Sequence, residues 1–226
     1  VDKDLLEQFN IIKSRVRTVS EDKPNVLWLH DLWNDPENEH LKDAEARKRF
    51  ARLVFVSNWQ LMTYQLGLGV PYSESFVLKN AIDPIQVPGN ADGTLNKDKD
   101  VIRLIYHTTP HRGLNIAVAG VQALWENGYK DKIHFDVFSS FNAYGWPERD
   151  EPYKDIFKTI EEHDGMTYHG FQPNSVVREA LGKAHIFAYP SIWQETSCIS
   201  AIEAMSAGCH VCLLYTSDAA DDLLCV

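Results

Sequence analysis

The sequence is poor in cysteine, in long apolar runs and in basic residues. Four cysteines in 226 residues are too few for a disulfide framework, and no apolar run approaches the ~20 residues that span a bilayer. We therefore expect a cytoplasmic protein without a membrane-spanning helix. Only 22 Lys and Arg face 32 Asp and Glu, a formal net charge of -10, which argues against non-specific binding to nucleic acid.

Both ends of the chain lack features of a complete protein. Val1 opens a segment that has neither an initiator Met nor the basic and apolar regions of a signal peptide. Residues 212–226 turn polar and acidic, and their LLYTSDAADD run resembles the translation of a transposase sequencing adapter. We expect a non-native tail there and an internal fragment overall. A natural acidic tail is the alternative.

Strand and helix signals alternate along the chain, which predicts an α/β fold with parallel sheets. Short apolar runs indicate buried strands, and longer runs of helix-forming residues indicate the helices between them. The predicted strands lie in 26–29, 53–56, 75–84, 101–106, 132–141, 166–170, 185–191 and 209–212. The predicted helices lie in 40–52, 58–68, 113–128, 151–163, 174–184 and 197–208.

A stretch rich in Gly, Pro, Asn and Asp interrupts the alternation at residues 85–100 and is typical of a linker. It divides the chain into two Rossmann-like lobes, residues 1–84 and residues 101–211, followed by the tail. Parallel sheets bind ligands beyond the carboxyl ends of their strands. We therefore expect a ligand cleft between the lobes.

The segment ETSCISAIEAMSAG, from Glu195 to Gly208, carries the clearest chemical signal. A buried strand ends just before it, and Thr196 or Ser197 can cap the helix that follows, so free backbone N–H groups can hold an anion. Six helical residues rise roughly 9 Å, whereas a retaining hydrolase holds its two carboxyls about 5–5.5 Å apart. Glu195 and Glu203 thus suit two hydroxyl-bearing parts of one extended ligand. Alternatively, they are a loop acid and a solvated helix residue.

The surrounding run YPSIWQETSCISAIEAMSAGCHV resembles the donor-binding segment of retaining glycosyltransferases of the GT-B fold, family 4 (glycosyl transferases group 1). FVSNWQ and NAID resemble the end of that family's acceptor lobe, and YHGFQPNSVVREALGKAHIFAYPS resembles its donor lobe. The resemblance implies a GT-B enzyme of polysaccharide biosynthesis. Such an enzyme transfers a sugar, as a hexosyltransferase, from a nucleotide-sugar donor to an acceptor hydroxyl with retention of configuration.

The same resemblance implies roles for individual residues. Glu195 is expected to contact hydroxyls of the transferred sugar, and Glu203 the ribose of the nucleotide. The backbone N–H groups of Thr196, Ser197 and Cys198 are expected to face the sugar or the diphosphate.

The HTTPHRGL turn supplies the basic residue of the expected site. Arg112 and Gly113 match the family's pair of a basic residue and a glycine, and a guanidinium there can bind diphosphate oxygens and stabilise the leaving nucleotide. A surface arginine is the alternative. Where the family carries a second basic residue, this chain has Tyr106 and His107. Stabilisation of the leaving nucleotide is therefore expected to be weaker, shared with His107 or arranged differently. Gly170 completes the expected donor-binding set.

In the first lobe, WLHD resembles the family's strand-end histidine near the donor sugar, which makes His30 the third catalytic candidate beside Glu195 and Arg112. The alternative for His30 is a hydrogen-bonded strand-end residue. The other histidines fit no metal-ligand spacing. We expect no metal and no cofactor, because basic residues and helix N-termini take the cation's electrostatic role in this fold.

Several questions stay open at the level of sequence. The acceptor can be a sugar, a lipid-linked molecule or a protein, and peripheral association with a membrane is compatible with any of these. A sugar-nucleotide epimerase of the GT-B fold and a non-catalytic nucleotide-sugar-binding protein are the competing functions. We expect the 226-residue chain on its own to be inactive.

Overall fold

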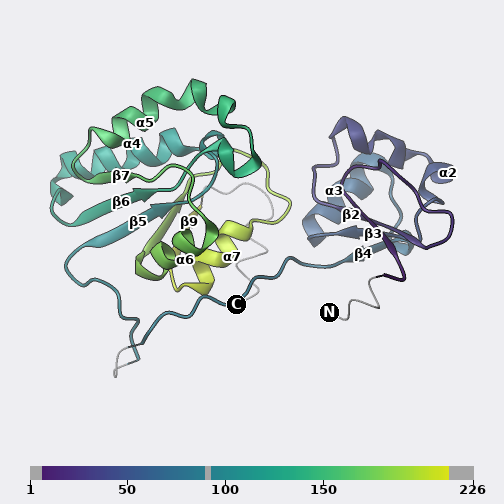
Figure 1. Cartoon of the computed structure of the whole chain (residues 1–226), viewed down its shortest axis with the longest axis horizontal. Coiled ribbons are helices and arrows are strands. Elements are labelled where there is room, and N and C mark those ends of the chain that lie inside the picture. The colour runs from purple at the N-terminus through teal and green to yellow at the C-terminus, as the bar shows by residue number, and fades with distance from the viewer. Residues whose placement is uncertain (1–6, 90–92, 214–226) are drawn as a thin grey trace. The chain divides into compact units, whose positions relative to one another are not determined.

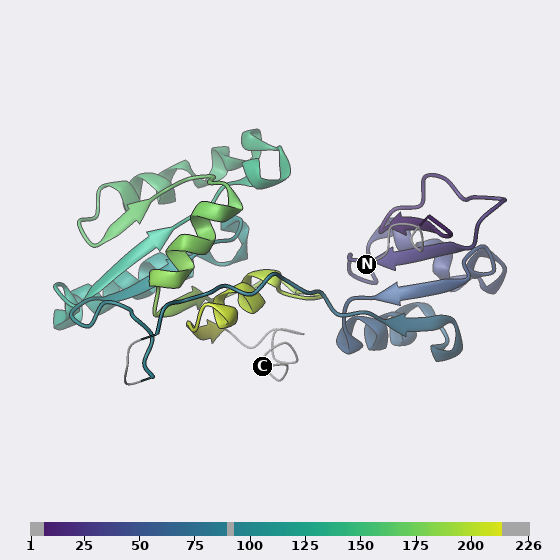
Figure 2. The same ribbon diagram turned by 60° about the horizontal axis from the view of Figure 1, so that its bottom comes forward.

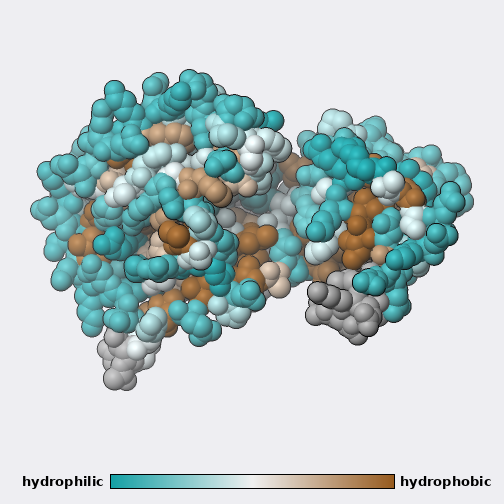
Figure 3. Space-filling view, viewed as in Figure 1, coloured by the Kyte–Doolittle hydropathy of each residue, from teal (hydrophilic) through white to brown (hydrophobic). Residues whose placement is uncertain are grey.

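The computed structural model describes residues 7–89 and 93–213. Contacts divide these residues into a first unit, 7–81 with 194–198, and a second unit that holds the rest. Each unit is built on one parallel sheet with helices packed against it (Figure 1), which confirms the predicted α/β class. Hydrophilic side chains cover most of both units in the view of Figure 3. Within the described ranges, no helix is long and apolar enough to cross a bilayer.

The first unit contains a four-stranded sheet in the order β1-β2-β3-β4. Its strands are β1 (Asn10–Lys13), β2 (Asn25–Leu29), β3 (Arg52–Phe55) and β4 (Ser75–Val77). A short 3-10 helix, η2 (Tyr72–Glu74), precedes β4. Apolar side chains of the sheet and of its covering helix form one buried core, which includes Leu27, Leu29, Leu53, Phe55 and Tyr64.

The helix α3 (Asn58–Leu68) of this unit forms as predicted. It begins after Ser57, whose hydroxyl accepts a hydrogen bond from the Gln60 N–H at 3.0 Å. It ends at Gly69, which has a φ of 68°, a conformation that suits glycine.

Two parts of the first unit differ from the prediction. The strand β1 was not expected, because only one of its four side chains, Ile12, is buried and its apolar signal is short. The predicted helix over 40–52 is instead a 3-10 helix, η1 (Pro36–Lys42), and a single turn, α2 (Ala44–Arg47). Asp43 separates them because its backbone is extended and its carboxylate accepts from the Glu45 N–H.

The second unit contains a five-stranded parallel sheet in the order β7-β6-β5-β8-β9. Its strands are β5 (Ile102–Tyr106), β6 (Ile133–Val137), β7 (Met166–Tyr168), β8 (Ile186–Tyr189) and β9 (His210–Leu213). The chain adds strands in one direction from β5 to β7 and then in the other from β8 to β9. The strands β5 and β8 are therefore the point at which the winding reverses, where doubly wound sheets bind their ligands.

Four α-helices connect these strands: α4 (Leu114–Leu124), α5 (Lys154–Glu161), α6 (Asn174–Lys183) and α7 (Ile199–Ser206). Figures 1 and 2 show α4 and α5 on one side of the sheet and α6 and α7 on the other. Shorter helical turns are η3 (Pro110–Arg112), η4 (Trp125–Tyr129), η5 (Phe141–Tyr144) and η6 (Pro147–Tyr153).

The helix α7 ends at a glycine. Gly208 has a φ of 66°, its N–H donates to the Met205 carbonyl at 2.8 Å, and the Cys209 N–H donates to the Ala204 carbonyl at 2.9 Å. These two bonds form a Schellman motif, which leads the chain from the helix into β9.

Residues of the expected linker pack on the second unit. The Ile85 N–H donates to the Ser206 hydroxyl at 2.8 Å. The Lys97 ammonium donates to the carbonyl of Ala184, which ends α6, and to those of Ala207 and Gly208 at 2.9 and 3.0 Å, which end α7. A positive charge is favourable at both helix C-termini, so this segment fastens α6 to α7. Of the expected adapter-derived tail, residues 212–213 continue β9 and residues 214–226 lie outside the described residues.

Candidate active site

The turns that follow β5 and β8 meet at the reversal point of the second sheet. Gly113 has a φ of 100°, and a Cβ added to it would lie 2.1 Å from the Pro190 carbonyl oxygen. No other residue fits this position without displacing the turn after β8. The predicted site residue Gly113 thus allows the backbones of the two turns to approach each other.

Arg112 lies beside this contact, at the end of η3. Its Nη1 donates to the Tyr189 hydroxyl at 3.3 Å, and the Tyr189 ring is fully buried and stacked on Phe187. Arg112 is partly buried, and its hydrogen bond to Tyr189 holds the guanidinium beside the ends of the two strands. A cation held at the carboxyl ends of two strands can bind an anionic ligand there.

Several buried polar atoms near these turns have no hydrogen-bond partner within the described residues. They are Nε2 of His107, Oγ1 of Thr108, Oγ1 of Thr109, Nδ1 of His111 and Oγ of Ser139. Four of these atoms follow β5 and the fifth follows β6. Buried polar groups are almost always hydrogen-bonded, so such a group of unpaired atoms indicates a place where a polar ligand or water binds.

Both histidines of this turn are uncharged at neutral pH. Burial lowers the pKa of His107 from 6.5 to about 4. Burial, followed by the neighbouring Arg112 charge, lowers the pKa of His111 to about 4 as well. Arg112 is therefore the cation of the turn, and His107 can contribute a hydrogen bond but no charge of its own.

Glu203 lies on α7 and is buried, with 7% of the residue exposed. Its Oε1 accepts from Nη1 of Arg178 at 3.2 Å and from Nδ2 of Asn174 at 3.3 Å. The alternative of a solvated helix residue is therefore wrong. Sequence reasoning missed both partners, although Asn174 and Arg178 stand four residues apart on α6 and so share one face of that helix.

The residues between Glu195 and Cys198 form a loop rather than the first turn of a helix. The helix α7 begins at Ile199, so neither Thr196 nor Ser197 is its cap. Glu195 is buried, with 8% exposed. These residues group with the first unit, where the Thr196 hydroxyl donates to the His30 carbonyl at 2.8 Å.

His30 follows β2 and is held by its backbone. Its N–H donates to the Ser14 hydroxyl at 3.2 Å, and Ser14 has a φ of 56°, which is uncommon for a residue other than glycine. The next carbonyl, that of Asp31, accepts from Gln60 and Tyr64 of α3. Burial lowers the pKa of His30, although the Asp31 charge acts in the opposite direction. Backbone hydrogen bonds at the end of β2 thus fix the position of His30. Such bonds are compatible with a catalytic role and with the alternative of a hydrogen-bonded strand-end residue.

Gly170, the last predicted site residue, follows β7 with a φ of 63°. It lies in the turn that leads to α6. The preceding residue, His169, forms a hydrogen bond with Asp136.

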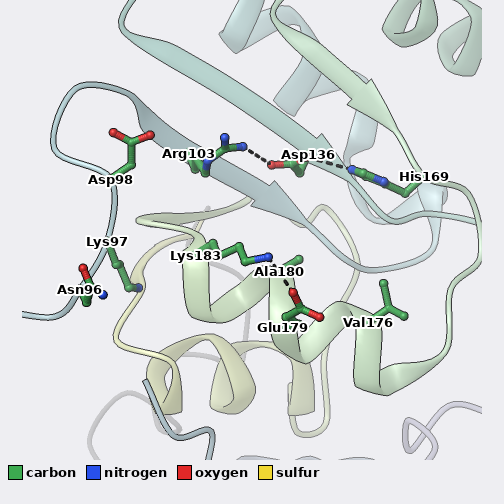
Figure 4. Close-up of a pocket in the computed structure, with 10 residues that line it drawn as sticks. All are labelled: Asn96, Lys97, Asp98, Arg103, Asp136, His169, Val176, Glu179, Ala180 and Lys183. Atoms are coloured by element: carbon green, nitrogen blue, oxygen red, sulfur yellow. Dashed lines mark hydrogen bonds and ion pairs between the residues drawn. The ribbon is translucent and has the colours of Figure 1, made fainter. Parts of the chain in front are cut away.

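A separate polar pocket of about 410 Å³ lies along the sheet beneath α6 (Figure 4). Arg103 and His169 both contact the Asp136 carboxylate, at 3.5 and 2.8 Å. Burial alone would raise the pKa of Asp136, but the neighbouring His134 and His169 side chains lower it. Arg103 pairs with Asp136 and Lys183 with Glu179, and none of the predicted site residues lines this pocket. No group of metal-ligand side chains occurs within the described ranges.

Comparisons with known proteins show the family and the fold to which the chain is similar. The family model described as glycosyl transferases group 1 matches residues 91–217. Comparison with curated protein sequences gives no match.

Solved structures share the fold at low sequence identity. The Anabaena protein HepE in complex with UDP and glucose matches with a TM-score of 0.65 and 14% identity, over 88% of this chain and 55% of that one. A glycosyltransferase from Rickettsia africae matches with a TM-score of 0.67 and 14% identity, over 92% and 58%. Sucrose-phosphate synthase from Thermosynechococcus elongatus matches with a TM-score of 0.62 and 13% identity, over 89% and 57%.

The chain therefore spans less than two thirds of the length of each of these structures. Its two parallel α/β units have the Rossmann-like form of the GT-B fold, as predicted. The chain belongs to the glycosyl transferases group 1 family.

Proposed function

We propose that this protein transfers a glycosyl unit from a nucleotide-sugar donor to an acceptor hydroxyl, with retention of configuration at the sugar carbon. The observation that carries the proposal is the approach of Gly113 to Pro190 at the reversal point of the sheet, with Arg112 beside it. This is where a doubly wound sheet binds a nucleotide. The reaction is expected to be cytoplasmic.

Arg112 is proposed to bind the donor diphosphate. Its planar guanidinium can hold two oxygens at once, and it stabilises the negative charge that develops on the nucleotide as the glycosidic bond breaks. Because it supplies this charge from a fixed position, the proposed reaction requires neither a metal nor a cofactor. The unpaired polar atoms of His107 and Thr109 in the same turn can bind further oxygens of the donor.

Glu203 is proposed to bind the ribose of the donor. Both of its hydrogen bonds to α6 go to Oε1. Its Oε2 makes no hydrogen bond within the described part of the chain and can accept from a ribose hydroxyl. Arg178 orients the carboxylate by its hydrogen bond to Oε1, and a buried ion pair needs such a partner.

The remaining candidates are proposed to act on the sugar. Glu195 would bind hydroxyls of the transferred unit, and the backbone N–H groups of Thr196, Ser197 and Cys198 would face the sugar or diphosphate. His30 would contribute a neutral imidazole near the donor, and Gly170 a backbone conformation that only glycine adopts freely.

The base of the donor is proposed to be uracil. HepE is described in complexes with UDP, with UDP and glucose and with UDP-glucose, and a pneumococcal O-GlcNAc transferase with UDP and GlcNAc. Their likeness to this chain is one of fold, so UDP serves as the first probe rather than as an assigned ligand.

The proposal is tested by calorimetric titration with UDP and by an assay of sugar transfer. Arg112→Ala is expected to weaken UDP binding about 10- to 100-fold, the effect of losing hydrogen bonds to a charged group. Arg103→Ala, which removes an arginine of the strand β5 that precedes the turn, should leave binding unchanged. Transfer is measured on the complete protein, because this chain alone is expected to bind the nucleotide without turnover.

Three outcomes would contradict the proposal. Undiminished transfer by both Glu195→Ala and Arg112→Ala would refute the assignment of the site. Binding of a nucleotide sugar by the complete protein without transfer would indicate a binding protein instead, and conversion of the sugar without an acceptor would indicate an epimerase.

A further inference from the structure

Large aromatic side chains are exposed beside the candidate site of the second unit. Tyr144, Trp146 and Trp193 are 54%, 46% and 47% exposed. Exposed apolar side chains that gather in one region often mark a surface that binds a ligand or partner. We call the aromatic rings of Tyr144, Trp146 and Trp193, with His111 and Phe141 that support them, the aromatic platform.

The loop that carries the platform is fixed by its own hydrogen bonds. The carboxylate of Asp150 accepts from the Ser140 hydroxyl and from the Phe141 N–H, the latter at 2.8 Å. The Trp146 N–H donates to the Phe141 carbonyl at 3.2 Å, and Gly145 between them has a φ of 74°. Tyr144 and Trp146 are thus presented to solvent by a closed turn, so binding would not have to order this loop.

The platform is continuous with the residues assigned to the donor. The His111 ring stacks on Phe141, with centroids 5.2 Å apart and planes 18° apart. It meets the Trp193 ring edge-on at 5.0 Å. The next residue is Arg112. The buried Nδ1 of His111 has no hydrogen-bond partner within the described residues. It therefore lies among the aromatic rings and next to Arg112, the residue proposed to bind the diphosphate.

We propose that the aromatic platform binds a sugar ring of a carbohydrate acceptor. The inference rests on the proposed transfer function, which requires an acceptor hydroxyl close to the donor. A sugar ring has an apolar C–H face bordered by hydroxyl groups, so it fits aromatic rings that lie beside a hydrogen-bonding imidazole. Burial keeps His111 neutral, so its Nδ1 can accept from a hydroxyl when Nε2 carries the proton.

The charge of the loop disfavours a membrane as the occupant. Glu148, Asp150 and Glu151 surround the single arginine of the loop, Arg149, which lies over the Trp146 ring at 4.4 Å. Surfaces that bind anionic lipid carry clusters of Lys and Arg instead. A neutral glycan is the ligand that these residues suit best.

The test measures binding of maltohexaose, cellohexaose and chitohexaose to the chain by calorimetry, with UDP titrated separately. We expect at least one of these oligosaccharides to bind, and we expect Trp146→Ala and Trp193→Ala to weaken that binding roughly fivefold to tenfold. Trp146→Phe should retain most of the affinity. The matched control is Tyr129→Ala, which removes an aromatic ring that is 52% exposed at the far end of α4 and should change little.

Three results would overturn the proposal. They are failure of all three oligosaccharides to bind the wild type, equal losses in Tyr129→Ala and Trp146→Ala, and Trp146-dependent binding to phosphatidylglycerol vesicles in place of glycans. UDP affinity separates this proposal from the proposed function, because Trp146→Ala should bind UDP normally. If the chain bound a glycan in a Trp146-dependent way but did not bind UDP, the proposed function would be contradicted. Binding of a sugar by the aromatic platform would still be supported.

Discussion

Arg178 joins Glu203 of α7 to the segment that enters the second unit. Its Nη1 lies 3.2 Å from Glu203 Oε1, and its Nη2 donates to the carbonyls of Asp83 and Pro84 at 2.6 and 3.2 Å. Only 9% of the Glu203 side chain is exposed, and removing one partner of such a pair leaves a buried charge unpaired. Three segments that are distant in sequence are thus held by one guanidinium.

Replacement of Arg178 should therefore destabilise the protein and weaken its ligand site together. We expect Arg178→Met to lower the free energy of unfolding by about 1–3 kcal/mol, the effect of losing hydrogen bonds to a charged group. The control is Lys183→Met on the same helix, whose exposed pair with Glu179 is worth less than about 1 kcal/mol. Urea unfolding measures both. Equal effects of the two changes would refute the special position of Arg178.

Gly113 should tolerate no side chain. A Cβ there would lie 2.1 Å from the Pro190 carbonyl oxygen and would occupy a φ of 100°. Gly113→Ala is expected to cost about 2–4 kcal/mol of stability and to abolish UDP binding. Gly120→Ala, in α4 with open space around it, should change stability by less than about 1 kcal/mol. The account fails if Gly113→Ala behaves like Gly120→Ala in thermal unfolding and in UDP titration.

Lys97 should stabilise the second unit although it comes from a loop-like stretch of sequence. Its ammonium is held by carbonyls that end α6 and α7, and burial lowers its pKa. We expect Lys97→Met to reduce the free energy of unfolding by about 1–3 kcal/mol, because buried carbonyls lose their donor. Lys99→Met, at an exposed position two residues later, should be neutral. If Lys97→Met left the free energy of unfolding unchanged, this segment would not hold α6 and α7 together.

His107 should make stability depend on pH. Because burial lowers its pKa from 6.5 to about 4, the unfolded chain binds a proton in a range where the folded chain does not. The contribution to stability is complete above pH 6.5 and falls as the pH drops to about 4.

Urea unfolding of the wild type and His107→Gln at about pH 7.5, 6, 5 and 4 checks this dependence, because these points cover the range from 6.5 to about 4. Relative to the variant, the wild type should lose about 1–3 kcal/mol across the range. A difference between the two proteins that stays constant with pH would contradict the burial of a neutral His107.

The sequence predicts the elements whose signals are local. The helix α3 covers residues 58–68 as predicted, with Ser57 and Gly69 at its ends, and Gly208 ends α7 in a Schellman motif. These residues act through backbone groups close to them in the chain, so their effect can be inferred from a short window. The prediction of one helix over residues 40–52 was wrong, because Asp43 ends one helical segment and caps the next.

The site is predictable only in part, for the same reason. Arg112 and Gly113 stand in a recognisable turn, but the need for glycine depends on Pro190, which is distant in sequence. Arg178 and Lys97 gave no signal, because their partners come from other helices and from the linker. Tertiary contacts of this kind determine the orientation of Glu203, and they cannot be inferred from the hydrophobic periodicity of the sequence.

The most direct test of the central claim is the location of UDP on the chain. Amide chemical shifts in a two-dimensional NMR spectrum, followed during titration with UDP, report which residues are affected. The largest changes are expected at Gly113 and its neighbours in the turn after β5, with further changes at Gly170 and Ser191, and all of them should be lost in Arg112→Ala. Changes confined to the pocket of Figure 4, around Lys183 and Glu179, would contradict the central claim.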